Sequence, residues 1–406
     1  MQRYSVNKGV DPFAAGWLVA FYLFVQLLAV PLWRAASGEA SLFTASFYMA
    51  TAGIGMYLVG YNLFNMRFRD CWRRPYSVLD RPWGWETVSI MIIGLFLAGF
   101  IIKGRHCVSA MNPGACVDDL GRNAFSPNLF HQLGATLLLC YLADLRRIWP
   151  KYSLYLKGSS FVMMLLFLGW ISWFGEGRFF MMASLFSFVI IEWYFGTRKD
   201  HYLFIFYGTV ILFLWFLRSW FKLQLMSADY VAQLTVGEFL FSSTVGRIAQ
   251  NHILSSVVIN WDGPWLHFAG WPDFFHQLFS RPLHFLDGND FGKPFILGYN
   301  DHRTGVGPTF MGDFYLNAGW SGVLVGMCLV GMIFRAVYEI RIACGLRCGT
   351  FIYASMLPIM VHGVEDWVFL SLARDLSTFL SCLVICMGLI LLGRVFLRNN
   401  AYARGV

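Results

Sequence analysis

Charge is scarce in this 406-residue chain: only 13% of its residues are Asp, Glu, Lys or Arg. Soluble globular proteins carry about 25% charged residues and about 45–50% apolar ones. Here 57% of the residues are hydrophobic and the mean hydropathy is +0.56. This composition excludes a disordered chain, which needs low hydrophobicity and high charge. It also argues against a soluble protein.

Metal-binding motifs, internal repeats and low-complexity tracts are missing as well. No Asp-X-Asp motif lies in a loop, and no Cys or His spacing resembles a zinc site. We therefore expect no metal and no other cofactor. A cleavable signal peptide is not expected either, because the first apolar block is too long and too aromatic and no small-residue cleavage site follows it.

Long apolar blocks fill the chain instead. A bilayer core of about 30 Å needs about 20 apolar residues in a helix. Ten blocks come near that length, at about Phe13–Trp33, Leu42–Phe64, Glu86–Ile102, Asn128–Leu145, Gly158–Phe174, Arg178–Phe195, His201–Leu217, Phe314–Tyr338, Thr350–Val364 and Leu376–Leu397. The sequence thus predicts an all-α integral membrane protein with about ten transmembrane helices. We divide it into an N-terminal bundle of seven spans (1–217), a large loop (218–313) and a C-terminal bundle of three spans (314–406).

The basic residues indicate how these spans are oriented. With the N-terminus in the cytoplasm, the inner segments hold 19 of the 31 Lys and Arg but only 8 of the 23 Asp and Glu. Every short inner loop then obeys the positive-inside rule. The net charge of +8 is a topology signal, about +11 inside and −3 outside, and it indicates no nucleic-acid partner. We expect a multi-pass protein of the bacterial inner membrane with both termini in the cytoplasm.

The outer, periplasmic face then carries the loop from Arg218 to Asp313, which is far longer than an ordinary connection and is expected to be functional. Apolar and polar residues alternate at helical spacing over 237–261, which favours a helix along the membrane surface. Four prolines divide the rest into short pieces, so we expect short helices in this loop. Cys107 and Cys116 also fall outside, where a disulfide and two free thiols are equally plausible.

A charged side chain at membrane depth is energetically costly, so its presence there indicates a function. Arg178 follows Gly175-Glu176-Gly177 at the outer mouth of a helix pair, where it binds an anion or anchors to lipid headgroups. Arg247 lies among Ser, Thr and Gly residues, which suits a pyrophosphate as well as a solvated helix face. These two arginines are the first candidates for a ligand site on the outer face.

Two further groups of polar residues lie next to the late predicted spans. The Gly-rich stretch from Tyr299 to Gly319 runs directly into a span, which suits close approach to an anionic ligand or an ordinary turn. His362, Glu365, Asp366 and Arg374 lie between the last two spans. The spacing of four residues places His362 and Asp366 on one helix face, as a functional pair or a structural one.

Arginine suits a phosphate because its planar guanidinium binds two oxygens and stays charged. A pyrophosphate gains charge as its bond to a sugar breaks. Fixed arginines would stabilise that charge in the transition state without a metal. The outer face therefore favours a lipid-linked pyrophosphate as its ligand.

The stretch Thr304–Gly322, TGVGPTFMGDFYLNAGWSG, resembles the segment that enters a late span in Wzy-type O-antigen polymerases. In that family a Gly-rich run is followed by an acidic residue, a Tyr, an Asn and a Gly. Gly177-Arg178, Arg374, the long outer loop and the ten spans are similar to the family as well. Arg281 and Gly292 match an Arg-to-Gly spacing described for some of its outer loops.

The resemblance implies a GT-C-like glycosyltransferase that uses no metal and no nucleotide sugar. It would move the growing glycan from undecaprenyl pyrophosphate onto the non-reducing end of a new lipid-linked repeat unit. The pyrophosphate would be bound by Arg178, Arg247, Arg303, Arg374 and Arg281. The acceptor proton would go to His302, Glu176, Asp313 or Asp366, and Tyr315, Trp261 and Trp265 would stack on sugar rings. Partners would be the undecaprenyl-linked donor and acceptor, membrane lipid and a chain-length regulator protein.

Other functions stay open. An O-antigen ligase uses the same donor but joins the glycan to lipid A core. Ligases typically have a His-rich stretch before the corresponding late span, where this chain has only His302. A flippase or transporter of polyprenyl-linked oligosaccharides would need polar groups inside the bundle, whereas these spans are expected to be nearly free of buried charge except at their outer ends. A structural membrane scaffold is a third class.

Overall fold

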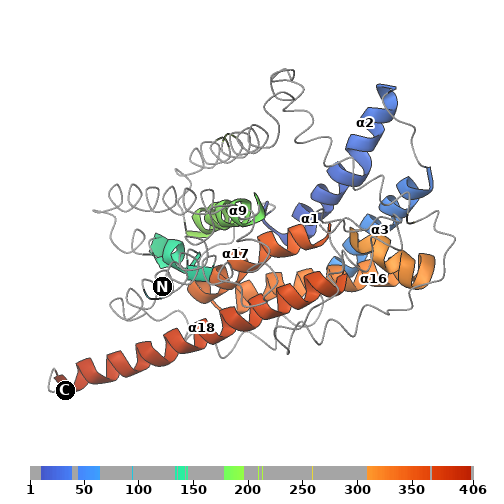
Figure 1. Ribbon diagram of the computed structural model, residues 1–406. Coiled ribbons are helices and arrows are strands. Elements are labelled where there is room, and N and C mark those ends of the chain that lie inside the picture. Colours follow the sequence, from blue (N-terminus) through green and yellow to red (C-terminus); the bar gives the residue numbers. More distant parts are fainter. Residues whose placement is uncertain are drawn as a thin grey trace, which may run out of the picture.

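The computed structural model describes residues 11–38, 44–64, 178–195, 309–365 and 368–403, parts of 133–144 and a few single residues. Regular structure in this part of the chain is helical throughout (Figure 1). The helices are α1 (Ala15–Phe24), η1 (Val25–Ala29), α2 (Val30–Ala36), α3 (Thr44–Leu63), α9 (Arg178–Phe195), α16 (Thr309–Ala343), α17 (Leu346–Gly363) and α18 (Val368–Ala403).

Three stretches of helix are long and apolar enough to cross a membrane, at Ala15–Trp33, Thr309–Ala343 and Asp375–Gly393. The prediction of an α-helical membrane protein is confirmed at this level. The predicted spans at 86–102, 158–174 and 201–217 lie outside the described residues, apart from single positions. Nearly all of the loop 218–313 lies outside them as well.

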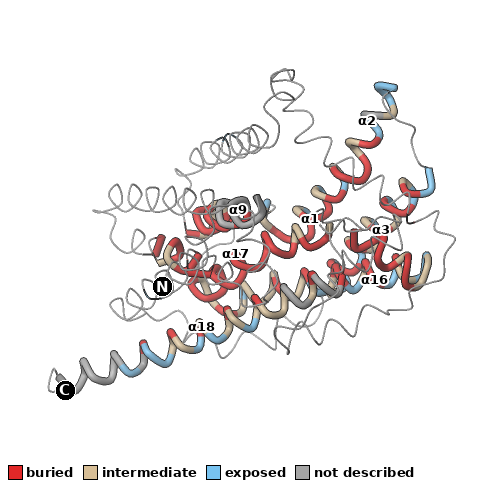
Figure 2. Tube along the Cα trace, in the orientation of Figure 1, coloured by how far each residue is buried: buried red, intermediate tan, exposed pale blue. Residues whose placement is uncertain are grey.

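The helices divide into buried and outward-facing ones. Residues of α17 are buried along almost its whole length, whereas exposed residues recur along α18 (Figure 2). Large apolar side chains are exposed on both α1 and α18. Trp17 and Phe21 on α1 are 62% and 67% exposed, and Val384 on α18 is 70% exposed. A surface of this kind would be costly in water. In a bilayer it faces lipid tails that are as apolar as the side chains themselves.

The tightest packing joins α3 and α16. A Cβ atom on Gly60 would clash with the backbone of Cys328, and one on Gly331 would clash with the carbonyl of Tyr57. Because these side chains are missing, the two backbones approach closely, which is how helices associate where apolar burial gains little. The Tyr57 ring then packs edge-on against Phe334, with 5.8 Å between the ring centroids.

We expect Gly60→Ala to weaken the fold, whereas Gly55→Ala on the same helix should not. A methyl group at position 60 has no room beside Cys328, and overpacking of this kind costs about 1–3 kcal/mol. Nothing lies within 4 Å of a Cβ on Gly55, where Ala should stabilise the helix by about 0.5–1 kcal/mol. Thermal unfolding of both variants in detergent measures the difference. Equal melting temperatures would contradict the close approach of α3 and α16.

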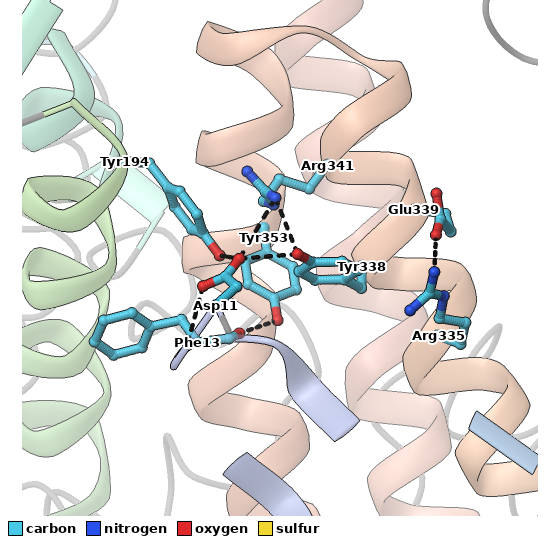
Figure 3. A network of polar contacts seen from close by, with 8 residues as sticks. All are labelled: Asp11, Phe13, Tyr194, Arg335, Tyr338, Glu339, Arg341 and Tyr353. Carbon is cyan, nitrogen blue, oxygen red and sulfur yellow. Dashed lines mark hydrogen bonds and ion pairs between the residues drawn. The ribbon is translucent and has the colours of Figure 1, made fainter. Parts of the chain in front are cut away.

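A polar network ties several helix ends together at one end of the bundle (Figure 3). Asp11, just before α1, accepts hydrogen bonds at 2.8 Å from the hydroxyls of Tyr194 and Tyr338. The Arg341 guanidinium lies 3.7 Å from the same carboxylate and stacks over the rings of Tyr194 and Tyr353. Thus α1 and α17 begin near this end, whereas α9 and α16 finish there.

A second polar contact near the start of α17 is a buried ion pair. The Arg347 guanidinium lies 2.6 Å from the Asp144 carboxylate, and the two side chains are only 7% and 4% exposed. The expectation that the spans bury charge only at their outer ends is therefore wrong. The physical reason is that α17 begins at Leu346, before the predicted start at Thr350, and so carries Arg347 into the packed bundle.

Candidate functional site

The stretch with the family resemblance forms a short helix that folds back on a long one. Within α16 the backbone leaves the helical conformation at Ala318 (φ −150°, ψ 21°) and Gly319 (φ 61°, ψ −149°). The positive φ of Gly319 is open to glycine but strained for other residues. After the break, a Cβ on Gly322 would clash with the carbonyl of Phe314. Glycine at both places lets residues 309–317 lie against the start of the second helix.

Asp313 on this short helix fixes where α18 begins. Its Oδ2 accepts the backbone N–H of Val368, the first residue of α18, at 2.8 Å. The Asn317 amide donates to Oδ1 at 2.7 Å, and the Asp313 side chain is almost fully buried. The first N–H groups of a helix have no partner within the helix, and a carboxylate satisfies one of them while matching the helix dipole.

The short helix holds the turn between α17 and α18 at two points. Phe310 donates its backbone N–H to the carbonyl of Val364 at 3.0 Å. Asp313 holds Val368 on the other side of the turn. Glu365 lies between these two contacts, so the position of its backbone is set from both sides.

The start of the short helix is strained. Thr309 has a φ of 65°, a region that β-branched residues rarely adopt. Among the described residues it is the only non-glycine residue with positive φ. Its hydroxyl accepts the N–H of Gly312 at 3.4 Å and so caps the helix. Strain of this kind clusters at functional sites, and it directs attention to this region of the bundle.

Glu365 receives two hydrogen bonds from the first membrane helix. The Tyr22 hydroxyl and the Gln26 amide both donate to its Oε1. Gln26 lies in η1, a π-helical turn, and such turns occur frequently at functional sites. The other carboxylate oxygen, Oε2, lies 3.7 Å from Nδ1 of His362. We define the polar junction as Tyr22, Gln26, Asp313, Asn317, His362 and Glu365.

The polar junction is recessed below the end of the first membrane helix. The Tyr353 hydroxyl of α17 donates to the carbonyl of Phe13 at 2.5 Å, which aligns the first part of α17 with the start of α1. The turn after α17 then meets Gln26, whereas the apolar helix continues to Trp33, about two turns further. Polar groups at membrane depth are tolerated where protein surrounds them or where they line a water-filled cavity. A polar site therefore lies inside the bundle rather than at its rim.

The structure describes the side chains of two predicted site residues, Asp313 and Tyr315. Tyr315 is half-buried on the short helix, with its ring edge-on to Trp320 at 6.1 Å. For Arg178, the first residue of α9, and Arg374, in the second turn of α18, it describes the backbone alone. The remaining predictions fall outside the described residues: His302, Glu176, Asp366, Arg247, Arg303, Arg281, Trp261 and Trp265, together with Cys107 and Cys116.

Sequence reasoning missed Tyr22 and Gln26. They are polar residues four apart in an apolar span, so they share a helix face, and this spacing was the signal that could have found them. The same spacing rule predicts a pair of His362 and Asp366. However, α17 ends at Gly363, and the turn that follows brings Glu365 to within 3.7 Å of His362.

The polar junction offers carboxylates, an imidazole, amides and a phenol. These groups suit hydrogen bonding to a ligand rich in hydroxyls, and proton transfer to or from it. Within the described ranges, no group of three or more His, Cys, Asp or Glu side chains could hold a metal ion.

Comparisons with protein-family models, with curated proteins and with solved structures find no match to this chain. The function is therefore inferred from the chain's own residues and their arrangement.

Proposed function

We propose that this protein is a glycosyltransferase of the bacterial inner membrane that polymerises lipid-linked oligosaccharide repeat units at its periplasmic face. It transfers the growing glycan from undecaprenyl pyrophosphate to the non-reducing end of a new repeat unit. Arginines stabilise the leaving pyrophosphate, and no metal takes part.

The observation that carries the proposal is the polar junction. The stretch that resembles Wzy-type polymerases supplies Asp313 and Asn317, and it holds the turn that carries Glu365. Transfer of a sugar from a membrane-anchored carrier needs polar groups that a lipid-linked substrate can reach from the bilayer. A recessed polar site in an apolar bundle is suited to that task.

Arg178 supports an anion site at the same level of the bundle. Ser187 on α9 donates to the carbonyl of Ala354 on α17 at 2.5 Å. The two helices run antiparallel, because Tyr194 at the end of α9 lies under Arg341, a few residues before α17 begins. The nine residues from Ser187 back to Arg178 match the nine from Ala354 to Gly363. Arg178 therefore begins α9 close to the level of the polar junction.

The position of Arg178 on its helix also favours an anionic ligand. A cation at the first residue of a helix is disfavoured by the helix dipole, and the first turn of α9 holds no acidic residue to offset it. A bound pyrophosphate would offset the charge of the Arg178 guanidinium and the partial positive charge of the helix start. The N–H groups at the helix start, which have no partner within the helix, would bind it as well.

The test is chain growth by purified protein in liposomes that contain lipid-linked repeat units and no energy source. We expect the wild type to form a ladder of products on the carrier lipid. Arg178→Ala should abolish long chains, and Arg178→Lys should restore them poorly because an ammonium cannot bind two phosphate oxygens side by side. Arg335→Ala makes the same charge change on the inner half of α16 and should keep the ladder. A wild type that makes no ladder would contradict the proposal.

A transporter of the same lipid-linked oligosaccharides is the second candidate. The specific observation in its favour is that the polar junction lies inside the bundle, where transporters bind their substrates. The liposome assay separates the two, because pure transport moves repeat units across the membrane without lengthening them. Chain growth without ATP or an ion gradient would exclude it.

A further inference from the structure

We propose that the polar junction is the acceptor-sugar subsite of this enzyme, in which His362 takes the proton of the attacking hydroxyl and Glu365 positions His362. This inference rests on the proposed polymerase function and deepens it. It adds His362, oriented by Glu365, to the candidate bases His302, Glu176, Asp313 and Asp366.

Glu365 is oriented before any substrate arrives. Tyr22 and Gln26 both donate to Oε1, and this leaves Oε2 directed at Nδ1 of His362 across 3.7 Å. That separation is longer than a normal hydrogen bond. Catalytic hydrogen bonds are often long in the absence of substrate and tighten when it binds.

The carboxylate also selects which nitrogen of His362 can act as a base. With a proton on Nδ1 directed at Glu365, Nε2 is left as the acceptor nitrogen. About 27% of the His362 side-chain surface remains exposed, against 16% for Glu365. A ligand can therefore reach the imidazole, while the carboxylate behind it stays largely covered.

The cost of this cluster argues for a role beyond packing. Four of its side chains, those of Tyr22, Gln26, His362 and Glu365, contact one another inside the bundle. Apolar residues at these positions would pack without any need for hydrogen-bond partners. Gln26 reaches Glu365 from a π-helical turn, a rare departure from regular helix geometry. Carboxylate, amide and phenol groups match the alternating donors and acceptors of a sugar ring.

Asp313 is a poorer base by the same reasoning. Its Oδ2 accepts the N–H of Val368 and its Oδ1 accepts the amide of Asn317. Both of its oxygens already serve the structure, and almost none of the side chain is exposed. The geometry thus assigns Asp313 to support of the site and His362 to the chemistry.

The step balances as a substitution at the anomeric carbon of the donor. The acceptor hydroxyl oxygen forms a bond to that carbon as the bond from the carbon to the pyrophosphate oxygen breaks. The electron pair of the broken bond leaves with undecaprenyl pyrophosphate. The hydroxyl proton moves to Nε2 of His362, and the imidazolium is stabilised by Glu365 until it releases the proton to water.

The experiment compares His362→Ala and Glu365→Gln with wild type in the liposome assay. General bases contribute about 10²–10⁴-fold to rates. We expect His362→Ala to slow chain growth by about 100-fold or more, with the KM for the acceptor nearly unchanged, and added imidazole to restore part of the rate. Glu365→Gln should lower the turnover number by about 10-fold or more, again with little change in KM. Recovery by imidazole is the readout that a purely structural role would not produce.

Tyr22→Phe and Tyr57→Phe form a matched pair of controls. Both remove one hydroxyl from a membrane helix, but Tyr57 donates to the carbonyl of Ala15, away from the polar junction. Tyr22→Phe should slow chain growth several-fold, and Tyr57→Phe should not. His362→Asn serves as a second variant if His362→Ala fails to fold, and it should be equally slow.

Two outcomes separate this inference from the function on which it rests. If the wild type makes no ladder, the polymerase proposal fails. If the wild type makes a ladder and folded His362→Ala and His362→Asn make it at the same rate, the polymerase proposal stands and His362 is not the base. The assignment of His362 as the base would also be overturned if the His362 variants were slow, showed a raised KM for the acceptor and were not rescued by imidazole.

Discussion

Asp313→Ala should destabilise the protein by about 2–4 kcal/mol, because it removes two buried hydrogen bonds and leaves the N–H of Val368 without its acceptor, whereas the Asn317 amide keeps its bond to the carbonyl of residue 313. The N–H of Val368 would lose the cap of α18, and the Asn317 amide would lose its contact with Oδ1. We expect a lower melting temperature in detergent and a turn between α17 and α18 that no longer holds one conformation. Thermal unfolding followed by size-exclusion chromatography measures this loss.

Two milder variants show whether Asp313 acts as a cap or as a base. Asn317→Ala removes only one of the two contacts and should cost about 1–3 kcal/mol. Asp313→Asn keeps an acceptor oxygen for Val368 and should fold at a reduced melting temperature. If folded Asp313→Asn still extends chains, the carboxylate serves the structure. Loss of chain growth in this folded variant would assign Asp313 to the chemistry.

Arg347→Ala should destabilise the protein by about 3–5 kcal/mol, because it leaves the buried Asp144 carboxylate without its cation. The double variant Arg347→Met with Asp144→Leu should recover most of that loss, since apolar residues of similar volume often replace a buried ion pair at little cost. Melting temperatures of the wild type, Arg347→Met, Asp144→Leu and the double variant complete a cycle. A double variant as unstable as Arg347→Ala would contradict this account.

This ion pair also offers a control for the functional assays. Arg347 lies near the start of α17, and the polar junction lies at its end. A folded double variant should therefore extend chains at the wild-type rate. Slow chain growth in that variant would mean that the two ends of α17 act together.

Apolar length was sufficient to predict several helices. The predicted span Arg178–Phe195 has the bounds of α9, and Leu42–Phe64 differs from α3 by one or two residues at each end. The reason is that a membrane helix needs a nearly continuous apolar run. α18 begins at Val368, before its predicted start at Leu376, because Asp313 caps it there. It also continues past the predicted end at Leu397 to Ala403.

The break in α16 could not be derived from hydropathy. The residues before Gly319 include Asp313 and Asn317 and are less apolar than those after it. Hydropathy therefore predicts one span that starts at Phe314, where the backbone forms two helices. The signal lies in the spacing of Gly319 and Gly322, which permits a positive φ and a close approach. The sequence alone does not show which segment packs against these glycines, and such glycines also fit an ordinary turn.

The contacts of Glu365 were beyond sequence reasoning for a different reason. Tyr22 and Gln26 lie 343 and 339 residues away from it, and local spacing rules carry no information about pairing at such a distance. Polarity alone could mark these residues as unusual in an apolar span. Only the packing of α1 against the end of α17 shows what they serve.

The same separation sets the order in which the protein must be assembled. Glu365 is synthesised 339 residues after Gln26, which is roughly 20–70 s later at about 5–20 residues per second. During that time the first span has no Glu365 carboxylate to accept the hydrogen bonds of Tyr22 and Gln26. The contacts of Glu365 with the first span thus form only after α17 has been made, however early that span enters the membrane.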